Sequence, residues 1–138
     1  MVEVKFYDSV EDLLLKYAVI IARYQEQWVF VRHRDRDSWE CPGGKREVNE
    51  DIRSCAAREL WEESGASVYS LFDMGVYGVT IDGVETFGML YFAEIYEFED
   101  LPDLEIAEVS LFKELPDHWT YPEIQPYLFR MIDKFIEI

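Results

Sequence analysis

The chain has 138 residues, of which 49% are hydrophobic, and 29 acidic residues against 13 Lys and Arg give it a formal charge of −16. This composition excludes intrinsic disorder, which requires low hydrophobicity, and it argues against long-range attraction to nucleic acid, which requires positive charge. The longest apolar run, at 17–22, is far too short to cross a bilayer, so no membrane span is expected.

The first third of the chain predicts β-structure. Residues 2–8 alternate between apolar and polar types, as in a short strand with one buried face. Residues 16–24 and 27–33 are rich in β-branched and aromatic side chains, which are typical of strands. Because only Gln25 and Glu26 separate these two runs, we expect them to form a β-hairpin.

Three arginines then alternate along the chain. Arg32, Arg34 and Arg36 would lie on one side of an extended segment, because successive side chains of a strand point to opposite faces. The bidentate geometry of arginine suits phosphate, so this side is a candidate substrate-binding surface, with Arg34 at its centre. Asp35 and Asp37 interleave with them, and an ordinary surface charge pattern is an equal alternative.

A glycine-rich turn and a helix follow. "PGGK" at 42–45 supplies two glycines, which permit unusual backbone angles and close approach of the backbone to a ligand. The helix is expected to begin after Asn49 as its N-cap, to run to about Ser64, and to end at Gly65 in a left-handed conformation. Its expected buried stripe, with members four residues apart, comprises Ile52, Ala56 and Leu60.

The second half adds strands and a final helix. Strand-like runs at 68–80 and 84–96 flank the turn signal "DG" at 82–83, and residues 106–112 form a further candidate strand. Pro122 or Pro126 is expected to open a helix in the tail, where apolar residues recur at helical spacing: Ile124, Tyr127, Leu128, Met131, Ile132 and Phe135. No linker or repeat interrupts the chain, so we expect one α+β domain over residues 1–138, with a mixed sheet and two main helices.

The end of the first helix carries an unfavourable cluster of acids. Glu59, Glu62 and Glu63 are close enough on a helix to repel one another, and they oppose the helix dipole, which favours cations at a C-terminus. Arg58 can pair with Glu62 but cannot neutralise all three. A divalent cation with oxygen ligands, Mg²⁺ or Mn²⁺, would make the cluster a site. The alternative is a solvated helix end whose repulsion salt screens.

The adjacent glycines favour the metal site, and the spacing of the charged residues resembles the Nudix box. Gly44 is followed after five residues by Glu50, and after seven more by Arg58, Glu59 and Leu60; Glu62, Glu63, Gly65 and Ala66 complete the pattern. Every charged and glycine position of the box is present, and Ala66 is smaller than the usual aliphatic residue. The resemblance implies the Nudix fold, a mixed β-sheet sandwiched between helices, and a hydrolase for a nucleoside diphosphate linked to a further group.

The resemblance also implies roles for individual residues. Glu59 and Glu63 would be the central metal ligands, joined by Glu62 and by the carbonyl of Gly43. Arg58 would orient the glutamates, Gly44 would shape the loop against the substrate, and Glu50 would anchor the loop near the helix start. Either Glu59 or a glutamate of a later loop would act as the general base, with Glu62 holding a metal or its water. A further metal ligand is expected outside the box, with Glu105 as the first choice and Glu108 as the second; ordinary solvent exposure is the alternative for both.

The substrate is less sharply indicated. The chain resembles small MutT-like bacterial members, which implies a nucleoside triphosphate, ordinary or oxidised, as the substrate. The alternatives are an RNA 5′ end, against which the negative charge argues mildly, and a non-catalytic nucleotide-sensing module, against which the intact box argues. Aromatic side chains that could stack on a nucleobase are Trp39, Tyr77, Phe87 and Tyr91, although core or sheet packing is the better reading of any one of them.

The remaining expectations concern location and assembly. Cys41 and Cys55 fit neither a disulfide framework nor a metal-ligand spacing, and no secretory signal is evident, so a cytoplasmic location is expected. His33 is expected to be structural rather than catalytic, because the box needs no histidine. A homodimer is compatible with the early strands and the many aromatic residues.

Overall fold

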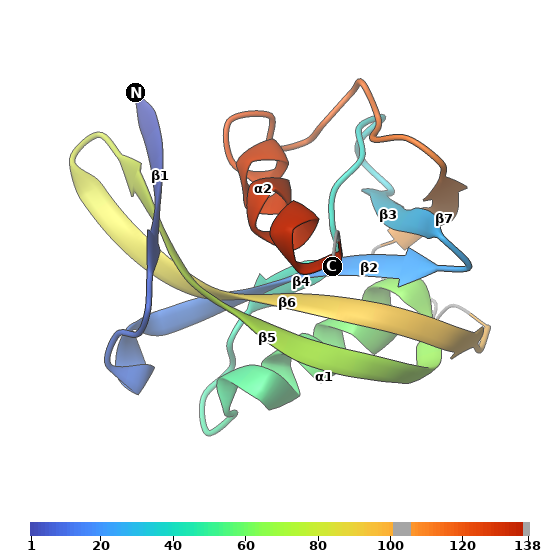
Figure 1. Ribbon diagram of the computed structural model, residues 1–138, viewed down its shortest axis with the longest axis horizontal. Coiled ribbons are helices and arrows are strands. Elements are labelled where there is room, and N and C mark those ends of the chain that lie inside the picture. The colour runs from blue at the N-terminus through green and yellow to red at the C-terminus, as the bar shows by residue number, and fades with distance from the viewer. Residues whose placement is uncertain (101–105, 137–138) are drawn as a thin grey trace.

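The computed structural model describes residues 1–100 and 106–136 and shows a mixed sheet with helices on both faces (Figure 1). Its strands are β1 (Val2–Tyr7), β2 (Leu15–Tyr24), β3 (Gln27–His33), β4 (Gly43–Lys45), β5 (Ala66–Ile81), β6 (Val84–Phe98) and β7 (Ile106–Phe112). The α-helices are α1 (Ile52–Ser64) and α2 (Gln125–Ile136), and a short 3₁₀ helix, η1, spans Asp12–Leu14.

The strands form one seven-stranded sheet with the order β1-β5-β6-β2-β3-β7, and β4 pairs with β2 beside this path. β2 and β6 run parallel, while β1–β5, β5–β6, β2–β3, β2–β4 and β3–β7 are antiparallel. Two tight turns confirm the predicted hairpins: Gln25 and Glu26 have φ of 50° and 67°, and Asp82 and Gly83 have φ of 51° and 83°. Positive φ at both central residues matches the right-handed twist of the flanking strands.

The two helices cover opposite faces of the sheet, with α1 below it and α2 above it in Figure 1. The buried stripe of α1 is confirmed: Ile52, Ala56 and Leu60 pack in a core cluster with Ile20 and Tyr91 of the sheet. On the other face, Leu128, Phe129 and Ile132 of α2 pack with sheet residues that include Ile21 and Phe30. The predicted α+β sandwich is therefore confirmed.

The ends of α1 confirm one prediction and correct another. Gly65 ends the helix with φ of 79°, as expected. Asn49 is not the N-cap; Asp51 is, because its side chain accepts a hydrogen bond of 2.8 Å from the backbone N–H of Ser54. Asn49 instead lies in the preceding turn with φ of 64°, a conformation that asparagine tolerates well.

The tail helix α2 begins at Gln125, so Pro126 lies in its first turn and Pro122 lies before the helix. The helix predicted from the apolar spacing is confirmed, and of its apolar residues Leu128 is fully buried whereas Tyr127 is 43% exposed. Across the described ranges, no helix is both long and apolar enough to cross a membrane.

Candidate active site

Two consecutive glycines bring the backbone of β4 against both the sheet and α1. A Cβ atom on Gly43 would meet the carbonyl oxygen of Ala18 in β2. A Cβ atom on Gly44 would overlap the carboxylate of Glu59 in α1. The backbone of β2 therefore requires glycine at position 43, whereas a side chain at position 44 would displace the Glu59 carboxylate. The predicted glycine-rich turn lies directly beside the glutamate cluster.

Glu63 is the most deeply placed acid of the cluster. It is only 7% exposed, and its Oε1 accepts a hydrogen bond of 2.9 Å from the backbone N–H of Gly43. Its Oε2 lies 3.2 Å from Nε2 of His33, at the end of β3. Three elements thus hold this carboxylate at the edge of the glycine strand.

Arg58 connects the loop to the helix. Its guanidinium donates to Glu50 at 2.7 Å and 3.0 Å and to Glu62 at 3.3 Å, and it lies 3.5 Å from Oε1 of Glu59. The hydrogen bonds from Arg58 lower the pKa of Glu50 to about 2 and raise the pKa of Arg58 itself. Both partners therefore stay charged at neutral pH, and Arg58 ties Glu50 to the glutamate cluster, a contact that the sequence analysis did not predict.

The surroundings of Glu59 oppose its ionisation. Its side chain is 13% exposed, and its pKa is raised to about 8, first by burial and then by the negative charge of Glu63. Arg58 opposes this shift but does not cancel it, because Glu62 adds further negative charge. With a pKa of about 8, Glu59 is largely protonated at neutral pH in the metal-free chain, and its ionisation beside Glu62 and Glu63 would be favoured by an added cation.

This donor set fits a hard divalent cation. Glu59, Glu62 and Glu63 offer carboxylate oxygens, the ligand type that Mg²⁺ and Mn²⁺ prefer, and added positive charge would relieve the raised pKa of Glu59. Within the part of the chain that the structure describes, no three acidic, histidine or cysteine side chains already converge as a formed metal cluster. In the metal-free chain, Glu62 is instead hydrogen-bonded to Arg58. Glu63 contacts His33 and accepts a hydrogen bond from the backbone N–H of Gly43.

Sequence reasoning missed one acid beside the site. Glu40 is 6% exposed, and its Oε2 lies 3.5 Å from Nε2 of His33, the same nitrogen that contacts Glu63. Its Oε1 accepts a hydrogen bond of 3.1 Å from Arg36. Hydrogen bonding to Glu63 raises the pKa of His33, and burial raises the pKa of Glu40. No local sequence pattern marks Glu40, because its contacts depend on β3 and, through His33, on the end of α1.

Several predicted residues lie elsewhere. Glu105 falls outside the described residues, and Glu108 is exposed on β7, where its carboxylate pairs with Arg32 at 3.4 Å. The extended segment ends at His33, so the alternation argument is wrong for Arg34 and Arg36, which follow the strand. Trp39 packs edge-on against Phe112, with ring centroids 5.1 Å apart, and lines a separate shallow hollow formed with residues 111–118.

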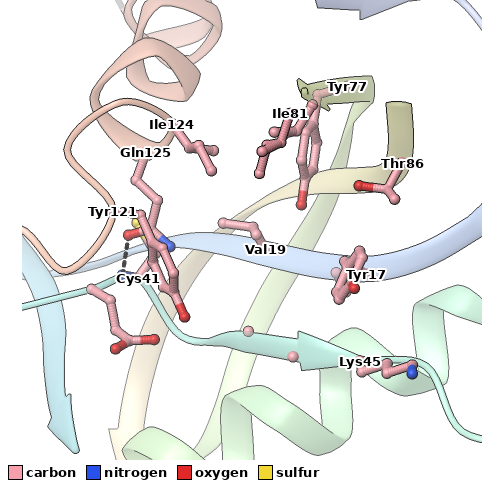
Figure 2. A pocket seen from close by; sticks show the side chains of 15 residues that line it. Tyr17, Val19, Cys41, Lys45, Tyr77, Ile81, Thr86, Tyr121, Ile124 and Gln125 are labelled. Carbon is pink, nitrogen blue, oxygen red and sulfur yellow. Dashed lines mark hydrogen bonds between the residues drawn. The ribbon is translucent and has the colours of Figure 1, made fainter. Parts of the chain in front are cut away.

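A cavity of about 380 Å³ opens on the far side of the glycine strand. Figure 2 shows its walls, which come from β2, β4, β5 and the region where α2 begins. Gly43, Gly44 and Glu40 all line it, so the cavity and the glutamate cluster share the same strand. Of the predicted stacking residues, Tyr77 lines this cavity, whereas Tyr91 is buried in the core on the α1 face.

Comparison with known proteins identifies the family of the chain. A NUDIX domain model matches residues 14–127. The chain is 36% identical over 118 residues to a protein of Bacillus subtilis described as "Putative 8-oxo-dGTP diphosphatase YtkD", a match that covers 85% of this chain and 74% of the relative. The crystal structure of a mutant of the Bacillus subtilis pyrophosphohydrolase BsRppH superposes with a TM-score of 0.83 at 31% identity, covering 99% of this chain and 90% of the other.

A more distant structure shares the fold alone. The NUDIX domain of Shewanella oneidensis NrtR, solved with ADP ribose, superposes with a TM-score of 0.68 at 12% identity. The match covers 88% of this chain and 87% of the NrtR chain. The family match spans more than half of the chain and contains the complete box from Gly44 to Ala66. The chain therefore belongs to the NUDIX family of hydrolases.

Proposed function

We propose that the chain is a Mg²⁺- or Mn²⁺-dependent pyrophosphohydrolase that converts a nucleoside triphosphate, ordinary or oxidised, to a monophosphate and pyrophosphate. The observation that carries the proposal is the gathering of Glu59, Glu62 and Glu63 at the end of α1, beside a glycine strand that also lines a cavity, in surroundings that oppose the ionisation of Glu59 without an added cation. The name of the Bacillus subtilis relative, a putative 8-oxo-dGTP diphosphatase, supports this substrate class.

Separate residues of the chain would bind the metal and position its ligands. A divalent cation, when bound, would neutralise charge developing on phosphate oxygens and lower the pKa of nearby water. Glu59, Glu62 and Glu63 would hold it, and the carbonyl of Gly43 stays a predicted fourth ligand. Arg58 would hold Glu62 and Glu50 in place through the hydrogen bonds from its guanidinium, and would so restrict the side-chain motion of the metal-binding carboxylates.

Removal of pyrophosphate from an RNA 5′ end is the second candidate. The extensive superposition with the pyrophosphohydrolase BsRppH supports it. The rims of the cavity offer further support, because Tyr17 and Tyr121 are 38% and 40% exposed and line its opposite ends in Figure 2. Exposed tyrosine rings are suitable platforms for bases of a single strand.

One assay separates these candidates. The purified chain is incubated with guanosine and adenosine triphosphates, the oxidised guanosine triphosphate and a short triphosphorylated RNA, each with Mg²⁺ or Mn²⁺ and with or without chelator. We expect chelator-sensitive release of pyrophosphate, fastest from a free triphosphate. Faster release from the RNA would move the assignment to the second candidate.

Variants test the site itself. Glu59→Gln should lower turnover at least about 100-fold, because even residues that only support metal ligands cost about 10–100-fold when changed. Glu97→Gln makes the same chemical change on an exposed position of β6 and should leave turnover unchanged. Full activity of Glu59→Gln would refute the metal assignment, and complete inactivity of the wild type with ligand still bound would favour a nucleotide-sensing module.

A further inference from the structure

The N-terminal strand ends the sheet on one side. β1 stands first in the strand order and, among the described strands, pairs with β5 alone; it lies at the left of the molecule in Figure 1. Within residues 1–100 and 106–136, no backbone hydrogen bond joins residues 2–7 to anything but β5. The outward N–H and C=O groups of such an edge strand can pair with a further strand.

β1 carries one acid and one base on the same face of the sheet. The side chains of Glu3 and Lys5 are 57% and 56% exposed, and Nζ of Lys5 lies 3.7 Å from Oε1 of Glu3. Charges of one sign on an edge strand prevent it from pairing with another copy, because like charges would meet. The charges of β1 are opposite, so a second copy of the strand can place an acid against each base.

One antiparallel register of two β1 strands opposes these charges. When a twofold axis passes through Val4, Glu3 of each copy lies opposite Lys5 of the other copy. An axis at Glu3 or at Lys5 would instead place two like charges directly opposite each other, which is unfavourable. A shift by one residue would bring apolar side chains onto the charged face. The charge pattern therefore selects the register centred on Val4.

The same register extends an exposed apolar row across the sheet. Val2 pairs in register with Ile81, and Ile81 pairs with Val84; the last two are 48% and 67% exposed. With the axis at Val4, Phe6 of a second copy lies opposite Val2 on the same face. Phe6 is 38% exposed in the single chain, and an aromatic side chain opposite a β-branched one stabilises a strand pair.

We propose that β1 is a self-association surface through which two copies of the chain pair antiparallel, about a twofold axis at Val4, and join their sheets into one. The partner is a second copy because β1 complements itself both in charge and in apolar pattern. The inference concerns assembly and does not depend on the substrate. A pair of six-residue strands is small beside a standard interface of about 1,600 Å², so we expect a weak dimer in equilibrium with the single chain.

Sedimentation equilibrium of the chain tests the association. The net charge of −16 opposes the approach of two copies, so the measurement is made at physiological ionic strength, which screens distant charges. We expect the mean mass to rise from one chain toward two between about 10 μM and about 1 mM. A mass of one chain throughout this range would overturn the inference. A mass that rises beyond two chains would also overturn it, because a twofold strand pair is closed.

A charge exchange tests the register. Glu3→Lys should weaken the dimer about tenfold, because the twofold axis turns two opposite-charge pairs into two like-charge pairs. The variant also lowers the net negative charge, which alone would favour association, so a loss is specific to the strand. Combining Glu3→Lys with Lys5→Glu recreates opposite charges in the same register and should restore the dimer. The matched control, Glu97→Lys on an exposed position of β6, should not weaken it. A double variant as weak as Glu3→Lys would refute the register.

Cysteine cross-linking locates the axis. Cys41 and Cys55 are buried, so a cysteine introduced into β1 is the accessible thiol. Val4→Cys would face its own copy across the axis and should form an intermolecular disulfide under mild oxidation. Lys5→Cys should not, because its counterpart would lie two residues further along the strand, beyond the Cα separation of about 7 Å that a disulfide spans. Cross-linking of Lys5→Cys in preference to Val4→Cys would contradict the proposed axis.

Discussion

Glu59 should make the metal-free protein less stable than a variant without its charge. Its pKa is raised from 4.5 to about 8 in the folded chain, by burial and by Glu63. A raised carboxyl pKa means that folding favours the protonated form, so stability is fullest below the unfolded pKa and is lost as pH rises toward the folded value. Glu59→Gln removes the titrating group while keeping its shape.

The size of the effect follows from the pKa shift. Each pH unit between the unfolded and folded pKa values costs about 1.4 kcal/mol. From the unfolded value of 4.5 up to neutral pH, ionisable Glu59 therefore costs the folded state about 3 kcal/mol. For a chain of this length, about 3 kcal/mol corresponds to roughly 10 °C in Tm.

Thermal unfolding of both proteins in chelator tests this reasoning. As pH rises from about the unfolded pKa of Glu59 to mildly alkaline values, this residue should lower the stability of the wild type but not that of Glu59→Gln. The curves of Tm against pH for the two proteins should therefore diverge as pH rises. Adding Mg²⁺ should raise the Tm of the wild type at alkaline pH and leave that of Glu59→Gln nearly unchanged. A wild type as stable as the variant at alkaline pH in chelator would refute the claim that the folded site opposes the ionisation of Glu59.

Three further changes probe the surrounding structure. Arg58→Ala removes the partner that lowers the pKa of Glu50 to about 2. The stabilisation from this pair is present above the ordinary carboxyl pKa and is lost as pH falls toward about 2. Urea unfolding should therefore show that the variant is less stable than the wild type at neutral pH, with a difference that shrinks in acid. Gly44→Ala places a methyl group on the Glu59 carboxylate and should lower kcat more than it lowers Tm, which paired kinetic and melting measurements would show. Asp51→Ala should lower the Tm by removing the N-cap of α1, whereas Asn49→Gly should not, since φ at that position is 64°; equal losses would argue against the assigned cap.

The sequence predicted the fold well where the determinants were local. The hairpin at Gln25 and Glu26, the Asp82–Gly83 turn and the left-handed stop at Gly65 each depend on two or three neighbouring residues, and all three are confirmed. The same holds for the ion pair of Arg58 with Glu62, which follows from helix spacing alone. The error at Asn49 arose because the chain offers two capping residues two positions apart, and propensity does not choose between them.

The parts of the site that sequence reasoning missed depend on distant segments. Glu40, His33 and Glu63 meet only because β3 and the residues before β4 lie beside the end of α1. Gln125 reaches Cys41 across 84 positions of sequence, and no local pattern marks it as a cavity residue. Strand alternation favours Arg34 as a substrate-binding residue, but β3 ends at His33, one residue before it.

The most direct test of the account is Mn²⁺ binding to the substrate-free chain, measured by equilibrium dialysis or by the magnetic resonance signal of the free ion. Glu63→Gln and Glu59→Gln are compared with the wild type and with Glu97→Gln, the exposed control. We expect the wild type and the control to bind Mn²⁺ with equal affinity, and each box variant to bind at least about tenfold more weakly. Unchanged Mn²⁺ affinity in both box variants would contradict the claim that the glutamates at the end of α1 form the metal site.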